Sequence, residues 1–212
     1  MNRRELLKSI ALVTGGVVIG GDIFLTGCKV GPKEEAGFTP GNIALLDEIG
    51  ETIIPATTTP GAKAAKIGQF MQVIVTDCYT QKQQDAFMKG ISEINVACDK
   101  MHGKSFMDCN EAERKDLLLS LEKEAKEFNQ KRDEHDAPLK EAHMKEQNTP
   151  PFNGVKEFDA SPSHYYTMMK QLTLWGFFTS ETGMTETLRH VAVPGKYDGA
   201  VPYTKGEKAW AE

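Results

Sequence analysis

The sequence predicts an all-α fold: a single bundle-like domain of about five or six helices with an irregular C-terminal tail. Apolar residues recur three and four positions apart through most of the chain, which is typical of helices with one buried face. No segment has the clear apolar–polar alternation of a strand, and no repeat of fixed period occurs. The 212 residues are enough to bury a core without disulfides or metals. These observations predict helices packed on helices.

An export signal is predicted ahead of the helical domain. Arg3 and Arg4 precede an apolar run over residues 10–19. A basic start, about ten apolar residues and small residues at a cleavage site make a secretory signal peptide, and the run is too short to span a bilayer. The arginine pair resembles a twin-arginine export signal, and Leu25-Thr26-Gly27-Cys28 resembles a bacterial lipobox. An N-terminal membrane anchor with a chance cysteine is the alternative.

The lipobox divides the chain into three parts. Residues 1–27 are the expected signal peptide, residues 28–38 a tether, and residues 39–212 the helical domain. Lipidation of Cys28 would hold the chain stably at a membrane on the periplasmic side of the cell envelope. Lys29 is not the aspartate associated with inner-membrane retention, so the outer membrane is slightly favoured.

Three helices are predicted in the first half of the domain. Thr39 is a capping residue followed by a first-turn proline, and Pro55 ends that helix. The second helix carries an apolar stripe at helical spacing, and Thr80 caps the third. The predicted ranges are residues 40–54, 64–79 and 81–101.

The second half begins with a helix whose far end the sequence leaves open. Asn110 and Glu113 form a capping-box pattern, and apolar positions continue at helical spacing to Phe128. Residues 129–147 are almost entirely polar and contain Pro138, so they either prolong the helix into solvent or form a surface excursion. Ser161-Pro162 suits the start of a further helix. The remaining elements are this helix over 163–178, a short helix over 185–190 and an extended tail over 194–210.

Three cysteines remain if Cys28 is lipidated. Cys98 and Cys109 flank an apparent turn with ten residues between them, and in an oxidising compartment this pair is the favoured disulfide. A metal site that joins both cysteines to His102 is the alternative, but no fourth ligand is evident. Cys78 fits plain core packing.

Aromatic residues near the C-terminus are the candidate partner interface. Trp175, Phe177 and Phe178 surround Gly176, where the missing side chain would allow another backbone to approach. The tail contributes Tyr197 and Trp210, and it needs a surface to dock on, either its own bundle or a partner subunit. Packing of this helix on its own core is the alternative.

The motifs of most cofactor and catalytic sites are absent. The sequence has no glycine-rich phosphate loop, no CxxCH for covalent haem, no HExxH and no GxSxG. We therefore predict no catalytic, cofactor-binding or metal-binding residues in this chain. His164, at a predicted helix start, fits a capping or surface role better than catalysis. A net charge of −5 without a basic stripe argues against nucleic acid as a partner.

Several segments, in this order and spacing, resemble the gluconate 2-dehydrogenase subunit 3 family. The specific ones are Ile54-Pro55-Ala56 with Thr59-Pro60-Gly61-Ala62, and Gly176-Phe177-Phe178-Thr179-Ser180. The resemblance covers most of the chain after the signal. Its segments are residues 45–55, 59–65, 87–91, 103–106, 172–180 and 197–199.

The resemblance implies an accessory subunit in a three-part periplasmic dehydrogenase. A large flavoprotein of the glucose–methanol–choline type would carry FAD and oxidise a sugar or sugar acid, and a cytochrome c subunit with haem c would pass on the electrons. The small subunit would have no catalytic residues and would support maturation and twin-arginine export of the flavoprotein. The lipobox departs from this pattern and implies that the subunit also anchors the complex.

Two other functions compete with this expectation. The first is a stand-alone lipoprotein that binds a sugar or another ligand in a pocket formed by Trp175, Tyr165 and Tyr166. The second is an enzyme that uses His164 or a cysteine.

Overall fold

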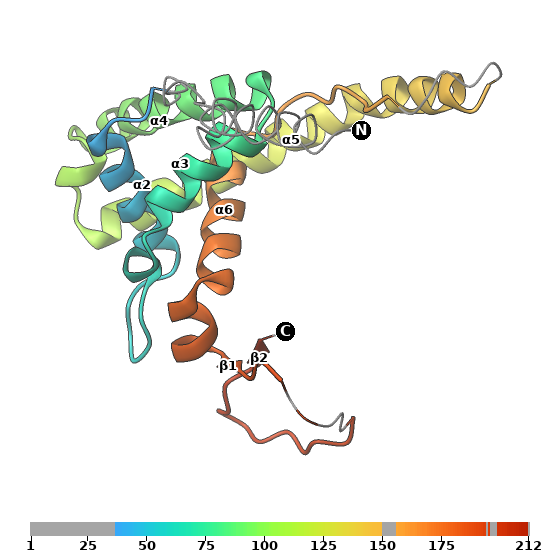
Figure 1. Ribbon diagram of the computed structural model, residues 1–212. Coiled ribbons are helices and arrows are strands. Elements are labelled where there is room, and N and C mark those ends of the chain that lie inside the picture. The colour runs from blue at the N-terminus through green and yellow to red at the C-terminus, as the bar shows by residue number, and fades with distance from the viewer. Residues whose placement is uncertain (1–36, 150–155, 194, 196–198, 212) are drawn as a thin grey trace, which may run out of the picture. The chain divides into compact units, whose positions relative to one another are not determined.

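The described part of the chain is all-α, as the sequence predicts. The computed structural model describes residues 37–149, 156–193, 195 and 199–211, and five α-helices make up most of them (Figure 1). They are α2 (Pro40–Ile53), α3 (Ile67–Cys78), α4 (Gln81–His102), α5 (Glu111–Gln147) and α6 (Tyr165–Thr179). Arg3, Arg4 and Cys28 lie outside the described residues, as do the predicted signal peptide and most of the tether.

Short elements connect the helices. The 3-10 turns η1 (Ala62–Ala65) and η2 (Phe106–Asp108) precede α3 and α5. Two-residue strands β1 (Arg189–His190) and β2 (Trp210–Ala211) pair in parallel. The α-helix predicted over 185–190 is not formed. The chain instead makes the π-helical turn η3 (Gly183–Thr187), in which the Leu188 N–H donates to the Gly183 carbonyl five residues earlier, and then enters β1.

Three helices begin at the capping residues that the sequence predicts. The hydroxyl of Thr39 accepts a backbone N–H from the first turn of α2. Thr80 and Gln83 form a complete capping box at α4, and Asn110 and Glu113 form another at α5. These contacts satisfy backbone N–H groups that have no partner within the helix.

The start of α6 differs from the prediction. The N-cap is His164 rather than Ser161, and its Nδ1 accepts the backbone N–H of Tyr166 at 3.3 Å. Ser161 is held by α5 instead, because its backbone N–H and its hydroxyl both donate to the carboxylate of Asp136. His164 therefore has the capping role that the sequence favours.

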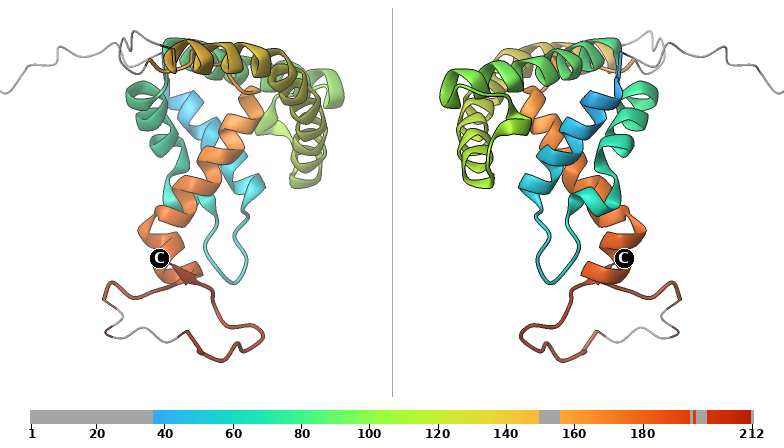
Figure 2. Two further views of the ribbon diagram at one scale, coloured as in Figure 1. Left: turned by 90° about the vertical axis from the view of Figure 1, so that its right-hand side faces the viewer. Right: turned by 90° about the vertical axis from the view of Figure 1, so that its left-hand side faces the viewer.

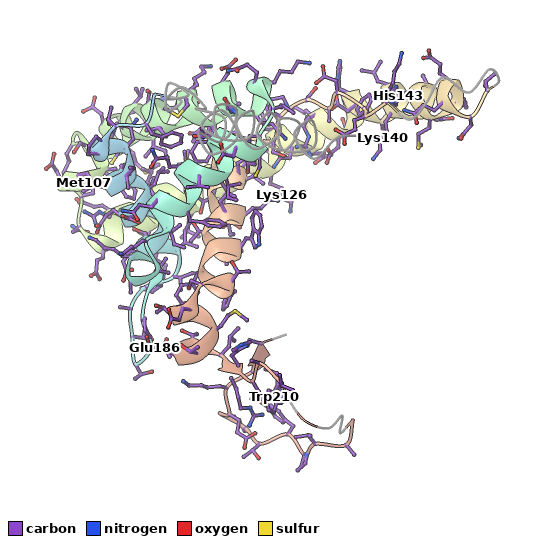
Figure 3. All side chains as sticks on the ribbon, viewed as in Figure 1. Met107, Lys126, Lys140, His143, Glu186 and Trp210 are labelled. Carbon is purple, nitrogen blue, oxygen red and sulfur yellow. The ribbon has the colours of Figure 1, made fainter. Side chains whose placement is uncertain are left out.

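Helix α5 continues well past the core. Residues 129–147 therefore prolong this helix and do not form a separate surface excursion. It has 37 residues and continues through Pro138. Its first half buries apolar side chains, while the distal half is lined by polar ones such as Lys140 and His143 (Figure 3). Residues 156–163 lie along this half, where His143 Nε2 is 2.9 Å from the Lys156 carbonyl oxygen. Polar contacts between these two segments thus replace an apolar core there.

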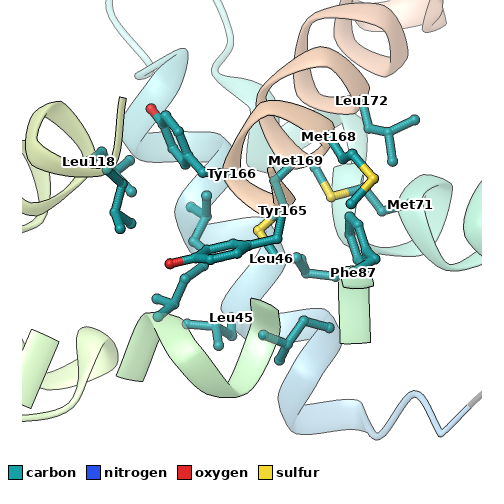
Figure 4. Packing of buried hydrophobic residues seen from close by; sticks show 14 of the residues in the cluster. Leu45, Leu46, Met71, Phe87, Leu118, Tyr165, Tyr166, Met168, Met169 and Leu172 are labelled. Carbon is teal, nitrogen blue, oxygen red and sulfur yellow. The ribbon is translucent and has the colours of Figure 1, made fainter. Parts of the chain in front are cut away.

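Helix α6 is the centre of the packing. It contacts all four other α-helices, and Figure 2 shows it crossing α2. Its inward side chains include Met168, Met169 and Leu172, which meet Met71 and Phe87 from α3 and α4 in the core (Figure 4). This one helix therefore joins the bundle together.

Two glycines mark the points where helices cross closely. A Cβ on Gly90 of α4 would lie 2.3 Å from the Cβ of Tyr165 on α6. A Cβ on Gly68 of α3 would lie 2.4 Å from the carbonyl oxygen of Ile43 on α2. Any larger side chain at either position would push two helices apart.

Candidate functional site: an aromatic surface on α3 and α6

The C-terminal half of α6 carries large apolar side chains on its outward side as well as on its inward side. Trp175 is 53% exposed, Phe178 41% and Leu174 39%, although all three are large and hydrophobic. Residues three and four positions apart share one face of a helix, so Phe178 adjoins both of the others. An outward face of this kind is unusual for a helix packed on a core, because the surface side is normally polar.

Helix α3 extends this face through Phe70, and the exposed Val73 lies three positions further along the same helix. The rings of Phe70 and Trp175 pack edge to face, with their centroids 5.3 Å apart. Gly176 makes room for this contact, since a Cβ there would lie 2.5 Å from Phe70 Cδ1. The sequence predicts a close approach at Gly176, but a ring approaches it rather than a backbone. We call Phe70, Val73, Leu174, Trp175 and Phe178 the aromatic surface.

The predicted interface residues do not all belong to this surface. Trp175 and Phe178 do, whereas Phe177 is fully buried in the core. The prediction for Phe177 is therefore corrected, because the orientation of α6 against the core points this ring inward while Phe178, about 100° further round the helix, stays exposed. Tyr197 lies outside the described residues.

Trp210 belongs to the tail and contacts its own chain. The guanidinium carbon of Arg189 lies 3.9 Å from the centre of the Trp210 ring, and the two residues are paired in the β1–β2 ladder. The backbone N–H of Arg189 also donates to the Ala209 carbonyl at 2.8 Å. Trp210 is shown at the end of the tail in Figure 3. At this point the tail thus contacts β1 of its own chain, and docking on the bundle or on a partner subunit stays a prediction.

Acidic residues of α2 hold the loop between α2 and α3. Glu51 Oε1 accepts the Ala56 N–H at 2.8 Å and Oε2 accepts the Lys63 N–H at 2.9 Å. Gly61 passes beside this carboxylate, because a Cβ there would lie 2.3 Å from Glu51 Oε1. The Ala62 N–H closes the loop on the Ile54 carbonyl at 2.9 Å. Residues 54–61, which belong to a segment that carries the sequence resemblance, therefore form a loop held by Glu51. We call this loop the clamped loop.

Two further carboxylates of α2 bind neighbouring elements. Asp47 accepts the backbone N–H of Gly68 at the start of α3, at 2.7 Å. Glu48 forms an ion pair with Lys63 at 2.6 Å and another with Arg114 of α5. The hydrogen bond from Lys63, with Arg114 alongside, lowers the pKa of Glu48. Sequence reasoning missed these roles because the partners lie 15 to 66 residues away.

The titratable residues inside the bundle are buried in surroundings that suit a structural role. Burial lowers the pKa of His164, and the opposing effect of Glu124 and Glu93 is smaller. Burial also raises the pKa of Tyr166 to about 12, so this phenol is neutral near pH 7. No group of three or more His, Cys, Asp or Glu side chains within the described ranges could hold a metal ion. The surroundings of His164 fit its capping role.

Of the three residues expected to form a ligand pocket, one lines the depression found in the described ranges. Tyr166 lines a depression of about 190 Å³ between α2, α5 and α6, whereas Trp175 and Tyr165 do not line it. Small-molecule sites are typically about 300–1,000 Å³. The Lys170–Glu122 ion pair also lies in this depression.

The helices in the described ranges include none with the length and apolarity that a membrane-crossing segment requires.

Comparison with known proteins gives one match. The family model for gluconate 2-dehydrogenase subunit 3 matches residues 40–195. No curated protein and no solved structure matches the chain. The matched range contains all five α-helices, the clamped loop and the aromatic surface. The chain therefore belongs to the gluconate 2-dehydrogenase subunit 3 family.

Proposed function

We propose that this chain is a non-catalytic accessory subunit of a membrane-associated, flavin-dependent sugar or sugar-acid dehydrogenase. The family match over residues 40–195 carries the proposal, because the family's name describes a subunit of gluconate 2-dehydrogenase. The partner in this proposal is a large flavoprotein of the glucose–methanol–choline type that binds FAD. A cytochrome c subunit with haem c is the second partner. The flavoprotein selects the substrate.

The surroundings of the polar groups support a role without chemistry of its own. Glu48 is neutralised by two cations, and Glu51 is committed to two backbone N–H groups. His164 uses Nδ1 to cap α6. A general acid or base needs a group free to exchange a proton with a substrate, whereas these groups are occupied by the fold.

The aromatic surface is the contact with the flavoprotein in this proposal. Exposed tryptophan and phenylalanine side chains are typical anchors of protein interfaces. A tryptophan buries 150–250 Å² in full, so the exposed half of Trp175 offers about 100 Å². Covering that area is worth about 2 to 3 kcal/mol, which corresponds to roughly a 30- to 150-fold gain in affinity before the costs of association are subtracted. A stable interface would cover about 1,200 Å² or more in total.

In this proposal the N-terminal segment directs the export and membrane anchoring of the chain. Arg3 and Arg4 direct export by the twin-arginine route, which carries folded proteins, and Cys28 carries the lipid. The complex then stands on the periplasmic side of the cell envelope, with the outer membrane slightly favoured. The subunit supports maturation, export or anchoring of its partner.

Co-purification tests the proposal. The tagged full-length chain is produced in its own host and isolated in mild detergent, and the eluate is examined for a large flavoprotein with a flavin absorbance spectrum. We expect recovery of this protein together with dye-reducing activity on a sugar or sugar acid. A chain that recovers no flavoprotein, in a host that makes one, would contradict the proposal.

Substitutions on the aromatic surface locate the contact. Trp175→Ala combined with Phe178→Ala should lower flavoprotein recovery at least tenfold, because both exposed rings are lost. Val96→Ala combined with Leu119→Ala is the control, since these apolar residues are also exposed, at 69% and 50%, but lie on α4 and α5. Thermal unfolding of both variants separates lost binding from lost folding. Equal recovery with the two variants would place the contact elsewhere.

Substitutions in the N-terminal segment test export and lipid anchoring separately from the partner contact. Arg3→Lys with Arg4→Lys should leave the chain in the cytoplasm, because a twin-arginine signal requires the pair. Cys28→Ser should leave an exported chain in the soluble periplasmic fraction. Export unchanged by the lysine pair, or membrane association unchanged by the serine, would contradict that part of the proposal.

A further inference from the structure

Two cysteines of the α4–α5 corner lie in contact. Cys98 is on the last turns of α4, and Cys109 directly precedes the N-cap of α5. Their Sγ atoms are 3.1 Å apart, and the side chains are 0% and 5% exposed. A disulfide joins sulfurs about 2 Å apart, so closing the bond needs a movement of about 1 Å. The two thiols are therefore neighbours that need no rearrangement of the helices.

The connection between the two cysteines is shaped by contacts that do not involve sulfur. Gly103 ends α4 in the left-handed conformation, with φ of 72°, and its N–H donates to the Asp99 carbonyl at 2.8 Å. The Phe106 N–H donates to Asn95 Oδ1 at 3.2 Å. Arg114 Nε donates to the Phe106 carbonyl at 3.0 Å. Folding alone thus brings the sulfurs together, before any bond exists.

Burial also affects how the Cys98 thiol reacts. Burial and, to a smaller extent, the neighbouring Cys109 thiol raise the pKa of Cys98 to about 12. The thiolate is the nucleophile and the metal ligand, so a thiol of this kind is a poor catalyst and a poor metal site. The prediction that Cys78 packs in the core is wrong, because Cys78 is exposed at the end of α3, where it is a free thiol. The pair is distinguished by proximity rather than by reactivity.

We propose that Cys98 and Cys109 form an intramolecular disulfide after the domain has folded, and that this bond links α4 to α5. The oxidant is a protein or small-molecule disulfide. One cysteine thiolate attacks it to form a mixed disulfide and releases one thiol. The other then attacks the cysteine sulfur of the mixed disulfide, which forms the Cys98–Cys109 bond and releases the second thiol. Two electrons and two protons pass from the pair to the oxidant.

The proposal that the domain folds before the disulfide forms rests on the proposed function. Twin-arginine export carries a chain that has already folded in a reducing compartment, where disulfides are rare. A fold that places the sulfurs in contact while reduced suits this route, because the bond can close later without unfolding. Since both thiols are buried, closure requires brief local opening of the 99–109 segment.

Peptide mapping tests the bond. The full-length chain is purified reduced, incubated natively with oxidised glutathione, blocked with a maleimide in denaturant and digested with trypsin without reduction. We expect peptide 90–100, which contains Cys98, joined to peptide 105–114, which contains Cys109. Peptide 67–82, with Cys78, should carry the maleimide. Maleimide on both members of the pair, or a bond to Cys78, would overturn the proposal.

Two controls make the result specific to the fold and independent of the proposed function. A chain oxidised in denaturant should give mixed pairings that include Cys78. In the native chain, reduction should lower the urea midpoint, whereas a Cys109→Ser variant should show no change on reduction. An unchanged midpoint in both would overturn the stabilising role. The bond could form with glutathione and yet be absent from chain isolated from the cell. That result would contradict the proposed oxidising compartment, but not the proposal that the fold allows the bond.

Discussion

The clamped loop between α2 and α3 offers the sharpest test of the structure. Glu51→Ala removes both acceptors that hold the Ala56 and Lys63 N–H groups. Gly61→Ala adds a Cβ that would lie 2.3 and 2.4 Å from the two Glu51 oxygens and 2.5 Å from the Ala56 nitrogen. At Gly61 φ is −90°, so the substitution adds no backbone strain and its cost comes from the clash. The two substitutions therefore act on the same contact.

The magnitudes follow from these distances. Each hydrogen bond lost in Glu51→Ala contributes about 1 kcal/mol, since water replaces part of an exposed interaction, so the total is about 2 kcal/mol. A domain of this size loses roughly 2–4 °C in Tm per kcal/mol, which gives a fall of about 4–8 °C. Gly61→Ala alone should cost about 1–3 kcal/mol. In the Glu51→Ala background it should cost less, because only the Ala56 nitrogen remains in the way.

Urea unfolding of the parent, both single variants and the double variant measures this coupling. We expect the double variant to be at least 0.5 kcal/mol more stable than the two separate costs predict. Gly41→Ala is the control, because its added Cβ would meet nothing closer than 3.7 Å. Additive costs, or a Gly61→Ala variant as stable as the parent, would refute the clamp.

Three further predictions concern α6 and the tail. Gly90→Ala should lower Tm by several degrees, because overpacking against Tyr165 at about 1–3 kcal/mol exceeds the gain in helix propensity; an unchanged or higher Tm would contradict the close crossing. The depressed pKa of His164 means that the unfolded chain binds its proton first, so stability should fall as pH drops below about 6.5. His164→Asn keeps a capping oxygen and should flatten the change in urea midpoint between pH 7.5 and 5, and an equal slope in both proteins would count against this role. Trp210→Ala should increase proteolysis of the tail by removing the ring beneath Arg189, without changing Tm by more than about 1 °C, and intact mass after limited trypsin digestion measures this.

Local sequence determined the helix starts at Thr39, Thr80 and Asn110. A cap joins a side chain to a backbone N–H two or three residues on, so the residues that form it are adjacent in the sequence. The helical period of the apolar residues likewise predicts the all-α class, since each buried face is a property of one segment. The same reasoning failed at α6, where Ser161 looks like a cap but is bound by Asp136 of another helix.

The sequence predicted only part of the candidate site. The motif near α6 indicates that aromatic residues matter there, but both phenylalanines fit the pattern equally well. Which one faces outward depends on how α6 is rotated against the core, and that buries Phe177 and exposes Phe178. The predicted pair of Cys98 and Cys109 stays a prediction, with the two sulfurs now placed in contact.

The sequence by itself determined the helical class, most helix boundaries and the resemblance to the family. Only the tertiary structure decided that α5 continues through Pro138, that Glu51 clamps the loop and that Gly90 admits Tyr165. Their cost or benefit arises largely from atoms that meet only once the chain has packed, as when Tyr165 packs against Gly90. A periodic pattern records which face of a helix is buried, but it carries no record of what lies against that face.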